Sequence, residues 1–277
     1  MDSNLSCKFE KLKAQLQSYQ SCAIAFSGGV DSTFLTAAAY DVLKEKCLAV
    51  IATSSTYPKR EYNSAIEWLK SNNIPYVVIE SEELDIPGFA ANPRNRCYFC
   101  KKELFSKVRK AADEHGLLVI ADGTNLDDLG DHRPGMQAGK ELNVKSPLLE
   151  CGFTKDDIRK LSKEIYNLPT ADKQPMACMS SRFPYGYEIT SQKLNQVEAI
   201  EDFLYENKFR TFRARHHGET LRLELDDIGI KRVLDTQMRS EIVKRAKDLG
   251  FVYVSLDLEG FRSGSMNEST EDNQAVV

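Results

Sequence analysis

The sequence predicts an α/β domain with a parallel sheet, followed by a smaller α+β domain. Four short, continuously apolar segments are predicted strands of the first domain, at residues 22–26, 47–52, 76–80 and 117–122. Segments with the apolar spacing of helices separate them, at residues 31–46, 60–72 and 100–116. Strands that are apolar on both faces and alternate with helices are typical of a parallel sheet covered on both sides.

Further helices are predicted on either side of this alternating pattern. Before the first strand, apolar residues recur at helical spacing: Leu5, Phe9, Leu12, Leu16 and Tyr19. Gly116 is expected to end the third helical segment. Beyond the fourth strand a helix is predicted over residues 154–166, with Thr154 as its N-cap. The stretch 168–186 contains proline and lacks helical spacing.

The pattern changes after Gly186. An amphipathic helix is predicted at about residues 190–208, and strands at 212–216, 220–225 and 251–258 with two short helices before the last. Because strands and helices no longer alternate, we expect a separate α+β domain here. The predicted limits are residues 1–186 for the nucleotide-binding domain, 187–266 for the substrate-binding domain and 267–277 for a polar, disordered tail.

Composition narrows the class of protein. No apolar run approaches the roughly 20 residues of a membrane helix, and the first residues lack the apolar core of a signal peptide. Seven cysteines in 277 residues favour a reducing, cytoplasmic setting with reduced or metal-bound thiols. The formal net charge of −4 provides no overall attraction for nucleic acid.

The segment FSGGVDST (residues 26–33) joins the first strand to a helix. A strand, a glycine turn and a helix N-terminus together make an anion site, because backbone N–H groups and the helix dipole point at the same place. Gly28 and Gly29 allow close backbone approach, and Ser27 and Ser32 add hydroxyl groups. The segment lacks the GK[ST] ending of the Walker A loop, so we expect a different kind of phosphate chemistry.

An acidic loop, ADGTNLDDLGDHRPG (residues 121–135), follows the fourth strand. Ligands of open α/β sheets bind beyond the carboxyl ends of the strands. Asp127, Asp128 and Asp131 are therefore predicted to position Mg²⁺ or the substrate. The alternative is a solvated loop whose aspartates cap local turns.

Cys97 and Cys100 form a CxxC pair in NRCYFCKKELF, and Cys178 follows later in the chain. Such a pair is compatible with half of a zinc site, a redox dithiol, an iron–sulfur site or a structural role. The four histidines show no ligand-like spacing to these cysteines, which disfavours zinc. A redox dithiol does not require Cys178.

The string SGGVDS resembles the PP-loop of ATP pyrophosphatases, which cleave ATP between its α- and β-phosphates. The resemblance implies that the loop, including Ser27, Gly28, Gly29 and Ser32, holds the pyrophosphate part of ATP, with Asp31 near Mg²⁺. It also places adenine and ribose near the end of the second strand, at Thr53 and Ser54, and makes Gly123 of the acidic loop a nucleotide contact.

Four classes share this kind of fold. Amide-forming synthetases use ammonia on the adenylate, tRNA thiolases use a sulfur donor on a nucleobase, and LarE proteins use sulfur on a pyridinium mononucleotide. The fourth class, regulators of the universal-stress type, needs neither the cysteines nor the acidic loop. A synthetase leaves the cysteines unexplained. A tRNA thiolase with a [4Fe-4S] cluster stays an alternative, disfavoured by the acidic balance and by the absence of an appended RNA-binding domain.

From about residue 21 to 266 the chain resembles the LarE family of nickel-pincer nucleotide biosynthesis. The matching strings beyond SGGVDS are RCYFCKKELF, DGTNLDDLGDHRPG, CMSSRFPYG, FRARHH and LDLEGFRSGSMN. LarE proteins occur in a form with one sacrificial cysteine and a form whose three cysteines hold a [4Fe-4S] cluster. With Cys97, Cys100 and Cys178 this sequence resembles the second form, in which three thiolates leave one iron open to an exogenous sulfide.

The resemblance implies an AMP-forming sulfur transferase that acts on pyridinium-3,5-biscarboxylic acid mononucleotide, with ATP, Mg²⁺ and the cluster as cofactors, and a homo-oligomer. Cys178 and Arg182 are its expected catalytic residues beside Asp31, and Ser181 and Glu201 its expected substrate contacts.

The strand FRARHH suggests a phosphate site. Arg213 and Arg215 share one face, because alternate residues of a strand do, and two guanidinium groups suit one phosphate monoester. The alternative is that both are solvated residues on an edge strand.

Overall fold

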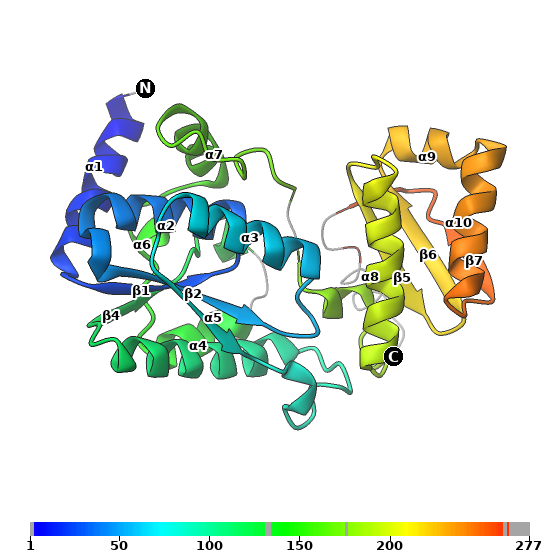
Figure 1. The fold of residues 1–277 in the computed structure, drawn as a ribbon, viewed down its shortest axis with the longest axis horizontal. Coiled ribbons are helices and arrows are strands. Elements are labelled where there is room, and N and C mark those ends of the chain that lie inside the picture. Colours follow the sequence, from blue (N-terminus) through cyan, green and yellow to red (C-terminus); the bar gives the residue numbers. More distant parts are fainter. Residues whose placement is uncertain (1–2, 131–133, 175–176, 263–264, 266–277) are drawn as a thin grey trace, which may run out of the picture. The chain divides into compact units, whose positions relative to one another are not determined.

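The structure is a computed structural model that describes residues 3–130, 134–174, 177–262 and 265. Its contacts divide the chain into two compact units (Figure 1). Unit 1 comprises Met1–Ile86 and Asn95–Met176, and unit 2 comprises Pro87–Arg94 and Ala177–Val277. We describe each unit by itself.

Unit 1 is built on a four-stranded parallel sheet in the order β3-β2-β1-β4. The strands are β1 (Cys22–Phe26), β2 (Cys47–Thr53), β3 (Tyr76–Glu80) and β4 (Val119–Ala121). Cys22 of β1 lies opposite Cys47 of β2 on one side and Val119 of β4 on the other. The four apolar segments therefore form the predicted parallel sheet, which confirms the fold class.

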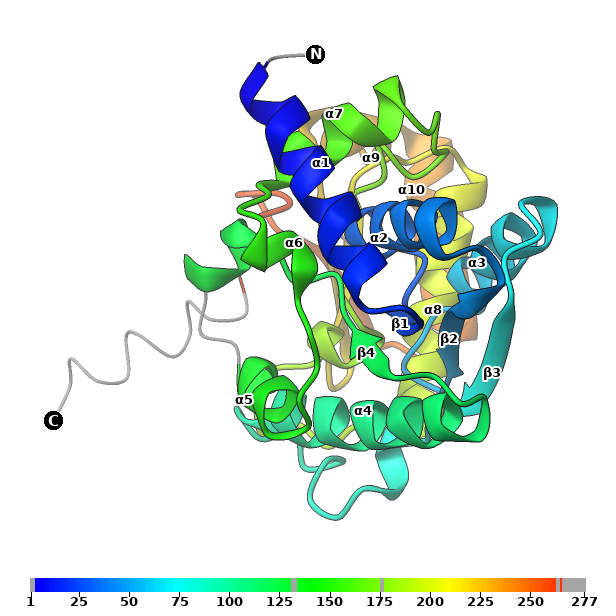
Figure 2. The same ribbon diagram turned by 90° about the vertical axis from the view of Figure 1, so that its left-hand side faces the viewer.

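Helices cover both faces of this sheet (Figure 2). The α-helices of unit 1 are α1 (Ser3–Ser18), α2 (Val30–Leu43), α3 (Lys59–Ser71), α4 (Arg96–Glu114), α5 (Pro134–Glu141), α6 (Pro147–Glu150) and α7 (Lys155–Glu164). Its 3-10 helices are η1 (Lys44–Lys46), η2 (Glu83–Asp85) and η3 (Leu126–Gly130). Helices α2 and α3 lie on one face and α4 and α5 on the other, while α1 and α7 pack on α2.

Adjacent residues of the central strand serve opposite cores. Ile24 of β1 packs into the cluster that α1, α2 and α7 build around Phe34. Its neighbour Ala23 packs into the cluster that contains Val108 of α4. Since successive side chains of a strand point to opposite faces, a strand buried on both faces must be apolar throughout, as this one is.

The strand order gives the sheet a switch point between β1 and β4. The chain moves outward from β1 to β2 and β3 and then returns to place β4 on the other side of β1. The connections that leave β1 and β4 therefore diverge, and ligands of open α/β sheets bind at such a switch point. Residues 27–32, here called the anion loop, follow the carboxyl end of β1, and the acidic loop follows the carboxyl end of β4.

Unit 2, over its described residues, combines a three-stranded sheet with three α-helices. The elements are η4 (Met179–Arg182), α8 (Ser191–Glu206), β5 (Phe212–His217), β6 (Thr220–Leu225), α9 (Asp227–Val233), α10 (Thr236–Asp248) and β7 (Tyr253–Leu256). Strands β5 and β6 are antiparallel and β6 and β7 are parallel, in the order β5-β6-β7. This mixed sheet is the predicted α+β arrangement.

The short segment Pro87–Arg94 belongs to unit 2 although the chain returns to unit 1 after it. The buried Asn92 side chain donates hydrogen bonds to the carbonyls of Phe183 at 3.1 Å and Pro184 at 2.7 Å. The predicted domain limits at residues 186 and 266 stay a prediction, and the tail at 267–277 lies outside the described residues.

The element boundaries differ from the prediction mainly in two places. Helix α4 begins at Arg96 rather than at Cys100, so Cys97 lies in its first turn. The short helices α5 and α6 were not predicted, because their few apolar residues give no clear period. Thr154 caps α7 as predicted, and its side chain accepts the N–H of Asp157 in a reciprocal capping box.

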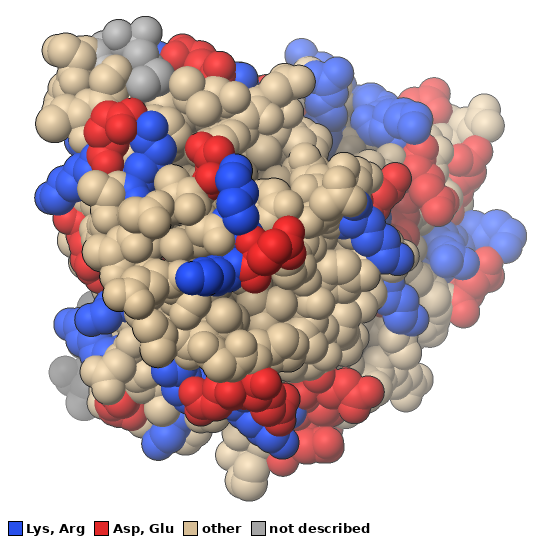
Figure 3. All heavy atoms as spheres, turned by 60° about the vertical axis from the view of Figure 1, so that its left-hand side comes forward, with Lys and Arg blue, Asp and Glu red and all other residues tan. Residues whose placement is uncertain are grey.

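In the part of the chain that the structure describes, no helix is long and apolar enough to cross a membrane. Figure 3 shows lysines and arginines interspersed with aspartates and glutamates on one face of the molecule.

Candidate functional site

The anion loop depends on Gly28. Its φ of +60° belongs to the left-handed region, which favours glycine. A Cβ atom at this position would lie 2.7 Å from Cβ of Ala65 in α3, well inside contact distance. The first glycine of SGGVDS is therefore required by both the turn and the packing of α3 against it.

Two hydroxyl groups shape the loop from inside. Ser32 Oγ accepts the Ser27 N–H at 3.2 Å and lies 3.1 Å from Ser27 Oγ. Gly29 is the N-cap of α2 and brings no side-chain hydrogen bond to the helix N-terminus. The first N–H groups of α2 are thus left to a ligand, and an anion is the ligand that they and the helix dipole favour.

The carbonyl groups of the loop are held from outside. Tyr57 Oη donates to the Ser27 carbonyl at 2.8 Å, and Lys173 Nζ donates to the Gly28 carbonyl at 2.9 Å. Lys173 also pairs with the buried Glu61 of α3. Arg159 of α7 fixes the segment before this lysine by donating to the carbonyls of Ala171 at 2.6 Å and Lys173 at 2.8 Å.

Asp31 lies in the first turn of α2 and forms an ion pair with Lys155. Its Oδ1 atom is buried and has no hydrogen-bond partner among the described residues. Burial raises the pKa of Asp31 above its ordinary value, although the neighbouring Lys155 acts in the opposite direction. Asp128 adds to the rise, which places a second carboxylate within electrostatic range.

The acidic loop packs directly against the anion loop. A Cβ atom on Gly123 would lie 3.0 Å from the backbone nitrogen of Ser32, so glycine allows this approach without a shift of the anion loop. Asp128 accepts the N–H of Asn125 at 3.0 Å, and Asp127 accepts the N–H of Lys155 at 2.6 Å. Both predicted magnesium ligands therefore also organise the loop, while Asp131 lies outside the described residues.

Thr53 and Ser54 lie at the end of β2, on the same edge of the sheet. Ser54 Oγ is 3.2 Å from Thr56 Oγ1, and both hydroxyls interact with the buried Glu83. Burial raises the pKa of Glu83, and its Oε1 atom accepts from Cys100 Sγ at 3.7 Å. Glu83 thus connects the end of β2 to the CxxC pair.

The three candidate ligand cysteines divide between the units. Cys97 and Cys100 are one turn apart on α4 in unit 1, so they lie on one side of the helix. Cys178 is an exposed residue of unit 2, immediately before η4. None of the seven cysteines forms a disulfide. Among the described residues, no three cysteine, histidine or acidic side chains gather into a metal site.

Unit 2 contains a buried network of arginines and glutamates. Arg182 donates to both oxygens of Glu201 on α8, at 2.8 and 2.9 Å. Burial alone would lower the pKa of Arg182, but the Glu201 carboxylate raises it above its ordinary value. Arg215 donates to both oxygens of Glu224 at 2.9 Å, and these two side chains are 1% and 0% exposed. Arg182 and Arg215 are thereby neutralised.

Arg213 differs from its two neighbours. It is 7% exposed, and among the described residues it lies within ion-pair distance of no carboxylate. Its guanidinium group stacks over the Phe261 ring at 5.0 Å from the centroid. Burial, and then the charges of Arg182 and Arg215, lower its pKa to about 10. The interpretation of Arg213 and Arg215 as solvated edge residues is therefore wrong, and Arg213 carries the charge that an incoming anion would balance.

Comparison with known proteins identifies the family. The chain is 34% identical over 274 residues to the pyridinium-3,5-bisthiocarboxylic acid mononucleotide synthase of Lactiplantibacillus plantarum, and the match covers 99% of this chain and 98% of that protein. The chain belongs to the LarE family. A relative from Synechocystis, 38% identical over 95% of this chain, is uncharacterized. No protein-family model matches the chain.

A second group of relatives matches about two thirds of this LarE chain. A glutamine-hydrolyzing GMP synthase subunit from Thermoplasma volcanium is 25% identical over 65% of this chain and 62% of its own length. The corresponding protein from Methanococcus vannielii matches 67% of the chain at 26% identity. The name of the Lactiplantibacillus relative describes an enzyme, which supports the prediction of an enzyme.

Several residues of the site were not predicted from the sequence. They are Tyr57, Glu61, Glu83, Lys155, Lys173 and Glu224, which lie outside the strings that resemble LarE proteins or beside them. A lone lysine or glutamate carries no local signal, because its partner is distant in the sequence. Glu224 is the exception, since its place opposite Arg213 in the register follows once β5 and β6 are paired.

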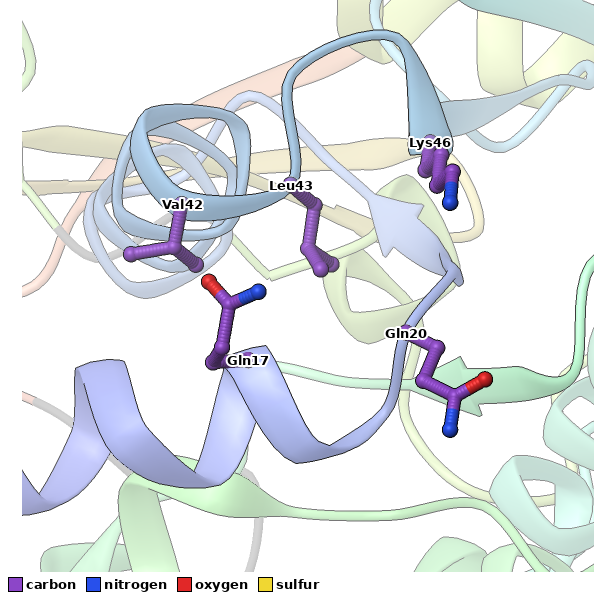
Figure 4. A pocket seen from close by; sticks show the side chains of 5 residues that line it. All are labelled: Gln17, Gln20, Val42, Leu43 and Lys46. Carbon is purple, nitrogen blue, oxygen red and sulfur yellow. The ribbon is translucent and has the colours of Figure 1, made fainter.

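A hollow on unit 1 lies away from these residues (Figure 4). It is lined by Gln17, Gln20, Val42, Leu43 and Lys46, from the C-terminal ends of α1 and α2 and the segments that follow them. The anion loop lies at the opposite, N-terminal end of α2. The hollow therefore does not belong to the candidate site.

Proposed function

We propose that this chain is an ATP-dependent sulfur transferase that converts a carboxylate of pyridinium-3,5-biscarboxylic acid mononucleotide to a thiocarboxylate. Two lines of argument support the proposal. The substrate follows from the name of the Lactiplantibacillus relative, which is matched over nearly the full length of both chains. The use of ATP follows from the anion loop, whose glycine conformation, uncapped helix N-terminus and adjacent carboxylates suit a metal-bound polyphosphate.

The proposed first step is adenylation. A carboxylate oxygen of the substrate attacks the α-phosphorus of ATP, the bond to the β-phosphate bridging oxygen breaks, and pyrophosphate leaves with the electron pair. The N–H groups at the start of α2 would bind the departing pyrophosphate. Asp31 would hold Mg²⁺, and this ion would neutralise the charge of the pyrophosphate. Sulfide then attacks the acyl adenylate, and the products are the thiocarboxylate and AMP.

Arg213 is the proposed anchor for the substrate phosphate. It is the buried cation of unit 2 without an ion-pair partner among the described residues, and a phosphate oxygen can accept from both of its terminal nitrogens. We expect three further residues to contact the rest of the substrate: Ser181, Arg182 and Glu201. The first two lie in η4, directly after Cys178, and Glu201 lies on α8 and pairs with Arg182. Arg215 stays a predicted substrate contact, with Glu224 as its present partner.

Cys97, Cys100 and Cys178 are the residues proposed to hold a [4Fe-4S] cluster. Thiolates are the ligands that iron–sulfur clusters take, and two of the three lie on one side of α4. When bound, such a cluster would present one iron to which an exogenous sulfide attaches. The alternative source is Cys178 itself, whose exposed thiol would be consumed.

One reaction tests the whole proposal. The protein, purified without oxygen, is incubated with ATP, Mg²⁺, sulfide and the biscarboxylate mononucleotide. We expect AMP and pyrophosphate as nucleotide products, and a substrate mass in which sulfur replaces one oxygen. The likeness to the GMP synthase subunits favours one rival, an ammonia-using synthetase, which would instead form the amide when ammonium replaces sulfide. Formation of ADP, or of the amide alone, contradicts the proposal. A parallel reaction with unfractionated tRNA in place of the mononucleotide tests the other rival, and thiolation of the tRNA would also contradict the proposal.

A further inference from the structure

Lys155 is the first residue of α7 and contacts both the anion loop and the acidic loop. Its ammonium group forms an ion pair with Asp31 Oδ2, and its backbone N–H donates to Asp127 Oδ2 at 2.6 Å. The ion pair is partly open to solvent, with side-chain exposures of 30% for Lys155 and 22% for Asp31. A flexible side chain held at its base can exchange partners without moving the helix.

The charges around the loop make Lys155 distinct from the other lysine at this site. Lys173 is held by Glu61, which is buried, and by the carbonyl of Gly28, so its charge is balanced from behind the loop. Lys155 instead faces the side on which Asp31 and the acidic loop lie. Any polyphosphate at the start of α2 therefore meets the charge of Asp31, and with it the charge of Lys155.

Asp31 on its own would oppose the ligand that the loop is built to bind. Two like charges 4 Å apart repel each other by about 1 kcal/mol in water and about 4 kcal/mol near a protein surface. A divalent metal held by Asp31 would offset this repulsion with its positive charge. Among the described residues, the cation paired with Asp31 is Lys155.

We propose that Lys155 is a polyphosphate-binding residue, whose ammonium group exchanges Asp31 for a phosphate oxygen of ATP as the divalent metal takes over the carboxylate. The inference rests on the proposed function and deepens it, because it assigns a residue to the pyrophosphate end of the nucleotide. The exchange also sets an order of events for the Lys155–Asp31 pair: Asp31 would become available to the metal when the phosphates of ATP bind Lys155.

A structural role for the ion pair is the rival interpretation. The pair joins α7 to α2, but the packing of α7 has other supports: Ile158 and Leu161 are buried in the core, and Lys8 of α1 pairs with Asp157 at 2.7 Å. Loss of the Lys155 ammonium should therefore leave the helix in place. This allows binding to be measured on a folded variant.

The test is calorimetric titration of the full-length chain with inorganic pyrophosphate, in EDTA and again in Mg²⁺. We compare Lys155→Met with Lys163→Met, a control at the other end of α7 whose partner Asp172 is exposed. A hydrogen bond to a charged group contributes about 1.5–3 kcal/mol, so Lys155→Met should weaken pyrophosphate binding in EDTA by about 10- to 150-fold. Lys155→Arg should retain most of the affinity, and Lys163→Met should match the wild type. Adenosine, which lacks phosphates, should bind equally to all variants.

A double variant separates direct phosphate binding from simple neutralisation of Asp31. If Lys155 binds phosphate, Asp31→Asn added to Lys155→Met does not restore pyrophosphate affinity in EDTA to the wild-type value. Full restoration overturns the proposal, and so does a Lys155→Met affinity within twofold of wild type. Wild-type protein that binds neither pyrophosphate nor ATP contradicts the proposed function itself. The melting temperature of each variant verifies that the titrated protein is folded.

Discussion

The buried Arg215–Glu224 pair is expected to dominate the stability of unit 2. Its side chains are 1% and 0% exposed, and two parallel hydrogen bonds of 2.9 Å join them. Removing one partner of such a pair leaves an uncompensated buried charge, which costs about 3–5 kcal/mol. Glu224 keeps a second partner, Arg222 at 2.8 Å, which is 31% exposed. We therefore expect Arg215→Met to cost about 3 kcal/mol, at the lower end of this range.

Glu224→Gln should cost more than Arg215→Met, because it leaves Arg215 charged in a site that water does not reach. The double variant Arg215→Met/Glu224→Met buries no charge and should be more stable than either single variant. With a urea dependence of about 2 kcal/mol per molar, a loss of 3 kcal/mol lowers the unfolding midpoint by about 1.5 M. Arg239→Met, at an exposed position of α10, is the control and should leave the midpoint unchanged.

The chain offers an optical separation of its two units for this assay. Trp68 is its one tryptophan and lies in unit 1, where it stacks on Phe26 at 5.7 Å between ring centroids. Circular dichroism follows the helices of both units. The substitutions should move the part of the dichroism transition that tryptophan fluorescence does not report. If Arg215→Met moves the midpoint no further than Arg239→Met, or if the double variant loses as much as both single variants together, the charge argument is refuted.

Three further predictions concern the site. Asp31→Asn should abolish pyrophosphate release. Burial raises the pKa of Asp31, so its carboxylate lowers the stability of the folded protein as the pH rises above the ordinary pKa of about 3.9. The variant should therefore melt at a higher temperature than wild type at pH 7 and at the same temperature near pH 3. Arg213→Met should weaken binding of the mononucleotide about tenfold or more, whereas Arg239→Met should not. The affinity of the wild type for the mononucleotide should depend only weakly on salt concentration, whereas binding of tRNA would depend on it steeply. Alanine at each of the three proposed ligand cysteines should abolish the roughly four irons per chain expected after anaerobic reconstitution, whereas loss of one sulfur from the protein after turnover would favour the sacrificial mechanism.

The parallel sheet could be predicted because its strands carry their own evidence. Residues 22–26 are apolar at every position, and such a strand fits only where both faces are covered. The glycine loop was predictable for a similar reason, since Gly28 meets a local requirement for a positive φ. Both signals lie within a few consecutive residues.

The partners of the site could not be predicted, because they depend on long-range packing. Lys155 and Asp31 are 124 positions apart, and Lys173 and Gly28 are 145 positions apart. No spacing rule connects such positions before the helices are placed on the sheet. The sequence also suggested equal roles for Arg213 and Arg215, since alternation determines only which face they share. They differ because of Glu224, which lies opposite Arg213 in the register of β5 and β6 but forms its ion pair with Arg215.

The excursion of Pro87–Arg94 into unit 2 has a consequence for synthesis on the ribosome. This segment emerges more than 80 residues before the carbonyls of Phe183 and Pro184 that its Asn92 side chain binds. Unit 1 is likewise interrupted, because α4 and β4 follow the excursion. Asn92 can therefore form these two hydrogen bonds only after unit 2 has been translated, and water solvates its amide until then. For the same reason, a chain cut at residue 176 would lose more than unit 2: it would retain a loop whose hydrogen-bond acceptors had been removed.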